Sequence, residues 1–164
     1  MTEWFCYVIK VMRQGDKDGI KTAIGVIALI WAALVFQGCN KSRNFDTAQF
    51  RGDIFQVSSA SFKEKTPAFY AHTDAAKEIF FFVVKVDGQM YSYFDICNSC
   101  KQHNRGYRAD KSFLECRNCQ VEIPYEDLKT GIGGCYPIPI AGKEENGIYS
   151  IPLSEILKGR QFFP

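Results

Sequence analysis

The chain has 164 residues, 46% of them hydrophobic and 15% aromatic, which is enough apolar material for the core of one domain with additional segments. Its formal net charge is +2 and its lysines and arginines form no basic stripe, so we expect no nucleic-acid partner. Its seven cysteines are unevenly placed: Cys6 and Cys39 lie in or beside an apolar N-terminal region, and the other five fall within residues 97–135.

The first predicted element is an apolar run of fifteen residues without a charge, 22–36, which follows Lys17 and Lys21. Its length suits the hydrophobic region of a signal peptide, whereas a helix that spans a membrane needs about 20 apolar residues. After the run, Gly38 stands directly before Cys39, and a small residue before a cysteine resembles a bacterial lipobox. We therefore predict lipidation of Cys39 in a bacterial lipoprotein.

Residues 1–39 are accordingly predicted to be a signal peptide or, as the alternative, an uncleaved membrane anchor that forms one hydrophobic helix. Both interpretations attach the protein to the cell membrane, and we expect the domain that follows to be extracytoplasmic. No twin-arginine pair precedes the apolar run. A cytoplasmic position of the domain therefore stays open, because a cluster is normally inserted before a folded protein crosses a membrane.

Residues 40–52 are polar and are predicted to form a linker to a folded domain over residues 53–164. The clearest element of this domain is the stretch 78–96, where two apolar and aromatic runs flank Asp87-Gly88. This pattern predicts a β-hairpin with a type I′ turn. A second hairpin-like unit follows, and the tail predicts a strand and a short helix, so the expected fold class is mainly β.

Two C-x-x-C pairs with fifteen residues between them are the main chemical feature of the chain: Cys97, Cys100, Cys116 and Cys119. Each pair presents two thiolates on one side of a tight turn, and two such turns on neighbouring loops can close a site of four sulfurs. The spacing is typical of a zinc ribbon and does not match the common ferredoxin runs. We predict that these four C-x-x-C cysteines bind one metal centre, and two disulfides are the alternative.

Cys135 is a candidate fifth cofactor-binding residue, because Gly133 and Gly134 before it would let the backbone approach a cluster closely. The alternative is a buried thiol without a role in the site. Two histidines are weaker candidates for metal ligands. His103 lies between the two pairs, where an exposed loop histidine is the simpler interpretation, and His72 lies in a predicted strand.

The sequence shows no recognisable nucleophile–base pair, phosphate-binding loop or pair of catalytic carboxylates. Asp95, close to the first C-x-x-C pair, is expected to be a turn residue. The aromatic residues of the stretch 80–94 are expected to form ordinary sheet core. A non-catalytic electron carrier or metal-binding protein is therefore favoured over an enzyme.

The order of the predicted elements resembles a Rieske domain, in which two ligand loops hold a [2Fe–2S] cluster. In a Rieske domain the second ligand of each loop is histidine, whereas Cys100 and Cys119 stand at these places here. Four thiolates carry more negative charge than two thiolates and two imidazoles, so such a cluster would have a lower reduction potential. The expected fold is thus a small Rieske-like or zinc-ribbon-like β domain.

The segments FDICNSC, GYR, FLECRNC, GGCYPIPI and GIYSIPL resemble, in order and spacing, the membrane iron–sulfur proteins of the FtrD-like family. The resemblance covers about residues 75–155 and extends more loosely from residue 52. It implies a membrane-attached protein that binds a cluster and is associated with uptake of iron or another metal. The chain has one apolar segment where many relatives have several membrane helices, and Gln120 where many have glycine.

Three functions are compatible with these features. The first is electron transfer by an iron–sulfur cluster, with [2Fe–2S] as the expected type, in support of metal uptake and with a redox or metal-transport protein as partner. The second is a structural zinc site in a module that mediates protein interaction. The third is a periplasmic metal carrier.

Overall fold

The computed structural model describes residues 44–131 and 133–164. The signal peptide or anchor predicted over residues 1–39, with its hydrophobic helix and with Cys6 and Cys39, lies outside the described residues. Within the described ranges, no helix is long and apolar enough to cross a bilayer.

The described residues form three β-sheets, which confirms the mainly β class predicted from the sequence. The large sheet has five strands in the order β1-β4-β5-β6-β10. β1 is parallel to β4, and the other neighbours are antiparallel. These strands are β1 (Asp46–Thr47), β4 (Ala68–Asp74), β5 (Lys77–Val86), β6 (Gln89–Cys97) and β10 (Pro137–Ile140).

The turn between β5 and β6 is the type I′ hairpin turn that the sequence predicts. Asp87 and Gly88 have φ angles of 49° and 76°, and the type I′ turn requires positive φ at both central residues. Val86 pairs with Gln89 across the turn. β6 continues from this turn to its last residue, Cys97, which is the first cysteine of the metal site.

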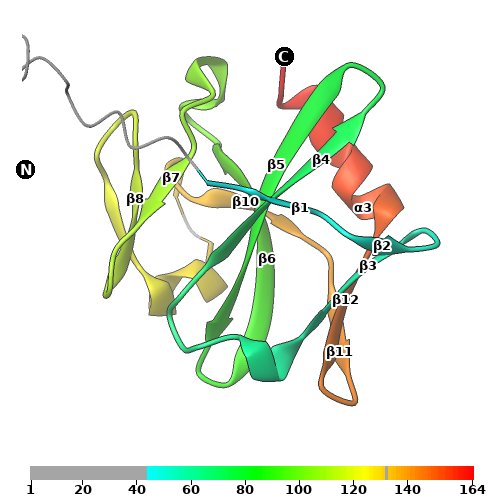
Figure 1. Cartoon of the computed structure of the whole chain (residues 1–164). Coiled ribbons are helices and arrows are strands. Elements are labelled where there is room, and N and C mark those ends of the chain that lie inside the picture. Colours follow the sequence, from blue (N-terminus) through cyan, green and yellow to red (C-terminus); the bar gives the residue numbers. More distant parts are fainter. Residues whose placement is uncertain (1–43, 132) are drawn as a thin grey trace, which may run out of the picture. The chain divides into compact units, whose positions relative to one another are not determined.

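β5 is almost entirely apolar because both of its faces are covered. Phe81 and Val83 belong to a first core, and Phe82 and Val84 belong to a second core. Alternate residues of a strand point to opposite faces of the sheet, so the large sheet separates the two cores. Figure 1 shows β7 and β8 on one side of β5 and β6, and β12 and α3 on the other.

The first core lies between the large sheet and a second sheet with the strand order β11-β12-β3-β2. The strands are β2 (Phe50–Arg51), β3 (Ile54–Ser58), β11 (Lys143–Glu145) and β12 (Ile148–Pro152), and η1 (Ser59–Ser61) follows β3. The tail continues from β12 into α3 (Leu153–Leu157) and η4 (Lys158–Gln161), so the predicted strand and short helix are confirmed. Ile156 and Phe163 of this tail are buried in the first core.

The second core lies beneath a third sheet with the order β7-β8-β9. Its strands are β7 (Tyr107–Ala109), β8 (Phe113–Cys116) and β9 (Glu122–Pro124), with η2 (Lys101–His103) before them and η3 (Tyr125–Lys129) after them. Tyr107, Leu114, Ile123 and Tyr125 fill the second core and are each at most 1% exposed. This packing holds the third sheet against β5 and places its turns beside the end of β6.

The sheets begin before residue 53, inside the stretch 40–52 that was predicted to be a linker. β1 pairs with β4 and β2 pairs with β3. Ala48, between them, is buried in the first core, and the ring of Phe45 lies 4.6 Å from that of Phe80. The polar composition of the stretch conceals the few apolar side chains that attach it to the sheets.

Candidate metal centre

The two C-x-x-C pairs lie at the ends of strands from different sheets. Cys97 is the last residue of β6, and Cys100 directly precedes η2. Cys116 is the last residue of β8, and Cys119 lies in the turn between β8 and β9. The packing of the third sheet on the second core brings these turns together.

The four C-x-x-C cysteines converge, as predicted. Their Sγ atoms all lie within 4.8 Å of one another, slightly wider than the separation of about 4 Å that bonds of about 2.3 Å would set around one zinc ion. The site has a buried and an open side: Cys97 and Cys116 are 2% and 1% exposed, whereas Cys119 is exposed to solvent.

Both turns place backbone N–H groups near their sulfurs. The amides of Ser99 and Cys100 lie near the Sγ of Cys97 and lower its pKa, while they donate to the Gly134 and Cys97 carbonyls. The amides of Asn118 and Cys119, two and three residues after Cys116, likewise lower the pKa of that thiol. These donors stabilise a thiolate more than a thiol, so the backbone is arranged for ionised sulfur.

The thiol pKa values are raised on the buried side of the site and lowered at Cys119 on the open side. Burial raises the pKa of Cys97 to about 11 and that of Cys116 to about 12. At Cys119 burial acts in the same direction, but hydrogen bonds from the Val121 amide and neighbouring thiols outweigh it and lower the pKa to about 7. Metal ligation requires thiolates, so binding at neutral pH displaces protons from the two buried sulfurs.

Cys135 lies at the open side of the cluster, with its Sγ 3.6 Å from that of Cys119. Its loop rests on the first turn, because the Ser99 amide donates to the Gly134 carbonyl at 2.7 Å. A Cβ at Gly134 would collide with the Oγ of Ser99, and Gly133 has a φ of 139° that favours glycine. The two glycines therefore permit the close approach that brings Cys135 to the other sulfurs.

Tyr107 is part of the site and was not identified from the sequence. Its buried hydroxyl donates to the Cys135 carbonyl at 2.6 Å and also faces the thiol of Cys97. Burial raises its pKa, so the hydroxyl remains a donor at physiological pH. No spacing rule marks this tyrosine; its signals in the sequence are its place between the two pairs and the GYR segment shared with the FtrD-like family.

Asp95 is not the turn residue that was expected. It lies within β6, is fully buried, and accepts a hydrogen bond of 2.7 Å from the Tyr107 amide. This bond joins β6 to the start of β7. Asp95 therefore helps to position Tyr107 and the first C-x-x-C turn against the third sheet.

The two histidines are not among the groups that converge on the site. His103 is exposed in η2, where its Nε2 lies 3.2 Å from the amide nitrogen of Gln102. His72 is in β4, with its ring 4.9 Å from that of Phe50, and burial lowers its pKa. Neither belongs to the sulfur cluster.

The donor set restricts the metals that fit the site. Four cysteine sulfurs are the ligands of structural zinc sites and of iron–sulfur clusters. Calcium and magnesium prefer oxygen ligands, which the cluster of sulfurs does not supply. The residues present therefore fit either zinc or an iron–sulfur centre.

The sequence model of one protein family, described as "Membrane iron-sulfur containing protein FtrD-like", matches residues 62–163. The matched range contains both C-x-x-C turns, Cys135 and Tyr107. No curated protein matches the chain.

Proposed function

The chain belongs to the FtrD-like family of membrane iron–sulfur containing proteins, and from this membership we propose that its four C-x-x-C cysteines ligate an iron–sulfur cluster in a protein that transfers electrons. The observation that carries the proposal is the match of this family's model over residues 62–163, which contain the four converging sulfurs. A cluster held there would supply one-electron redox chemistry.

The protein would set the reduction potential through opposing contributions. Amide N–H groups of both turns lie near the sulfurs of Cys97 and Cys116 and stabilise negative charge there, which raises the potential. Ligation by four thiolates adds negative charge and lowers the potential relative to a centre with two histidines. We expect a potential below that of Rieske centres, with the amide donors limiting the difference.

The exposure of the ligands supports a route for electrons. Cys97 and Cys116 face the second core, whereas Cys119 is exposed and Cys135 is partly exposed beside it. A redox partner would therefore approach on the side of Cys119 and Cys135. The same exposed thiols would be the entry path for a metal.

We also propose that the site is Rieske-like in its architecture. Two loops, one at the end of β6 and one between β8 and β9, supply two ligands each, and the small third sheet supports the second loop. Cysteine occupies the positions where Rieske domains have histidine. The two ligand loops would thus be arranged as in a Rieske domain, whereas all four ligands would be cysteines, as in ferredoxins.

Attachment to a membrane and a link to metal uptake complete the proposal. The family name supports attachment to a membrane. The resemblance to FtrD-like proteins supports electron transfer in the service of iron or other metal uptake, with a redox or metal-transport protein as partner. We place the domain outside the cytoplasm, after a lipidated Cys39 or an uncleaved anchor.

A structural zinc site is the second candidate, and one observation favours it. Sulfurs that all lie within 4.8 Å of one another are near the separation of about 4 Å that a single zinc ion would set. In that case the metal would hold the two turns together and the exposed face would serve a protein partner.

Metal analysis of the full-length protein, purified in detergent without oxygen, separates the candidates. We expect iron and acid-labile sulfide in equal amounts, visible charge-transfer absorption, and a paramagnetic signal after one-electron reduction. Zinc without sulfide would contradict the electron carrier and support the structural site. Cys116→Ser should lose the metal, whereas His103→Gln, at an exposed residue between the two pairs, should retain it.

A further inference from the structure

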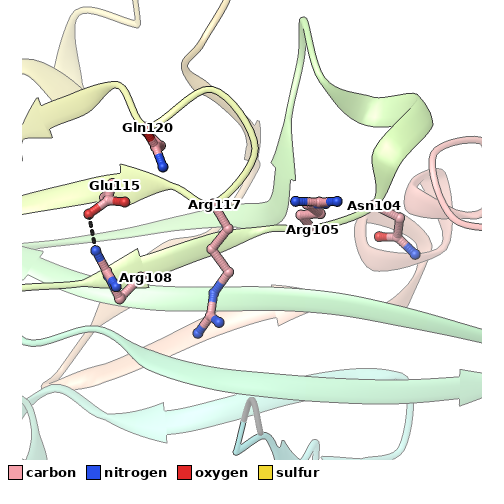
Figure 2. Close-up of a pocket in the computed structure, with 6 residues that line it drawn as sticks. All are labelled: Asn104, Arg105, Arg108, Glu115, Arg117 and Gln120. Atoms are coloured by element: carbon pink, nitrogen blue, oxygen red, sulfur yellow. Dashed lines mark hydrogen bonds and ion pairs between the residues drawn. The ribbon is translucent and has the colours of Figure 1, made fainter. Parts of the chain in front are cut away.

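A polar pocket lies beside the metal centre and plays no part in the function proposed above. It has a volume of about 500 Å³ and is lined by Asn104, Arg105, Arg108, Glu115, Arg117 and Gln120. Figure 2 shows these side chains, with the ion pair between Arg108 and Glu115 at one end. Three of the six lining residues are arginines, so the pocket presents many more hydrogen-bond donors than acceptors.

The positive charges of the pocket are only partly neutralised. Glu115 pairs with Arg108, directly across the β7–β8 ladder. Within the part of the chain that the structure describes, Arg105 forms no side-chain hydrogen bond or ion pair, and the terminal amino groups of Arg117 donate to no partner. Two cationic groups without a counter-charge therefore line one cavity.

Arg117 is held in place for binding. Its Nε donates to the Tyr107 carbonyl at 2.9 Å, and its backbone amide donates to the Gly106 carbonyl at 3.0 Å. The residue is half-buried. A guanidinium that is fixed through Nε keeps its two amino groups available as a planar fork, the geometry that matches carboxylate and phosphate oxygens.

Gln120 adds an unusual backbone conformation at the rim of the pocket. Its φ is 59°, in the left-handed region that favours glycine. Its amide N–H closes the second turn by donating to the Cys116 carbonyl at 2.8 Å. The exposed side-chain amide of Gln120 lines the pocket and offers two N–H donors to an anion.

The surrounding charge strengthens the attraction for an anion. Residues 97–120 contain five lysines and arginines and two acidic residues, a net charge of +3, whereas the whole chain carries +2. The excess positive charge is thus concentrated on the segment that carries the metal site and the pocket. Clefts lined by one sign of charge focus the field and raise the local concentration of the opposite ion.

We propose that this pocket binds a small anion bearing carboxylate or phosphate groups, held by the guanidinium groups of Arg105 and Arg117 and the side-chain amide of Gln120. The site does not require that the neighbouring cysteines hold iron rather than zinc. It lies beside the turn that carries Cys116 and Cys119, so the bound anion would sit next to the metal centre.

Isothermal titration calorimetry of the full-length protein in detergent tests the proposal, with citrate and inorganic phosphate as probes at constant ionic strength. We expect saturable one-to-one binding of at least one probe. Tighter binding of citrate identifies a carboxylate ligand, and tighter binding of phosphate identifies a phosphate ligand. Metal content is measured on the same samples, so that a failure of anion binding can be told apart from a wrong assignment of the metal.

Three variants give the test its specificity. Arg105→Gln removes an exposed positive charge, and Gln120→Gly removes the amide while suiting the positive φ; each should weaken binding about tenfold while metal content is retained. Lys143→Gln removes an equal charge from β11, far from the pocket in sequence and in another sheet, and should leave affinity within about twofold. Binding that is absent for both probes, or that falls equally in Arg105→Gln and Lys143→Gln, overturns the proposal.

Discussion

Cys135 occupies a position beside the cluster of sulfurs without belonging to it. Its Sγ lies 3.6 Å from that of Cys119, but it is not among the four sulfurs that lie within 4.8 Å of one another. A thiol in this place can donate a hydrogen bond to a ligand sulfur without completing the coordination sphere. Comparing a variant of Cys135 with a variant of a ligand cysteine tests whether Cys135 is a metal ligand or a hydrogen-bond donor.

We predict that Cys135→Ser retains the metal but shifts the reduction midpoint or the visible spectrum, because it changes a donor to the sulfur of Cys119. One hydrogen bond of about 1 kcal/mol corresponds to a shift of about 40 mV for a one-electron couple. Cys116→Ser should lose the metal, because it removes a ligand. Protein-film voltammetry and metal analysis measure both effects. An unchanged spectrum and midpoint in Cys135→Ser would reduce the loop to a structural turn.

Tyr107 is the second residue with a testable role at the site. Its hydroxyl holds the Cys135 carbonyl and faces the thiol of Cys97. We predict that Tyr107→Phe lowers the midpoint, because the polar hydroxyl that faces the sulfur of Cys97 is lost. The same change should lower the free energy of unfolding by about 1–2 kcal/mol, because the Cys135 carbonyl loses its hydrogen-bond donor. Tyr91→Phe is the control, since the Tyr91 hydroxyl binds the exposed Gln89 side chain at 2.7 Å, away from the cysteines. Equal midpoints in the two variants would contradict the assignment.

The elements are arranged so that one strand serves two separate cores. β5 contributes alternate side chains to the first core, beneath the tail, and to the second core, beneath the metal-bearing third sheet. A change in the first core should therefore alter stability without altering the geometry of the sulfurs.

Gly159 in η4 allows a test of this separation. A Cβ at this position would lie 2.5 Å from Cε1 of Phe94 and 2.8 Å from Cγ2 of Ile79, two residues of the first core. We predict that Gly159→Ala lowers the free energy of unfolding by about 1–3 kcal/mol through overpacking. Denaturant unfolding followed by circular dichroism measures the loss, and metal content and midpoint should match those of the unchanged protein. A shifted midpoint would show that the two cores are coupled.

Across the whole molecule, the metal site and the proposed anion pocket share one positively charged segment. Adding an electron makes the metal centre more negative, so an anion in the pocket should bind the reduced protein more weakly. By linkage, the anion must then lower the reduction midpoint by the same free energy.

We predict that a saturating anion lowers the midpoint by about 59 mV for each tenfold difference in affinity between the two oxidation states. Voltammetry with increasing citrate or phosphate at constant ionic strength measures this shift. Arg105→Gln should reduce it, and Lys143→Gln should preserve it. A midpoint that rises with the anion would contradict the predicted sign.

Several features could be predicted from the sequence because they depend on residues close together in the chain. The positive φ angles at Asp87 and Gly88 follow from the turn chemistry of an Asp-Gly pair, and the mainly β class follows from alternation in neighbouring residues. Each C-x-x-C turn is likewise local. The convergence of the two turns was predicted from their spacing, since four sulfurs with this separation are a recurrent metal-binding pattern.

Other features depend on contacts between distant segments, and only the folded chain reveals them. The hydrogen bond from the Tyr107 hydroxyl to the Cys135 carbonyl joins residues 28 positions apart, and the bond between Asp95 and the Tyr107 amide requires two sheets to meet. The pocket gathers Arg105, Arg117 and Gln120 from two loops that packing brings together. Local preferences set the turns and strands, whereas burial of the two cores decides which side chains face one another across them.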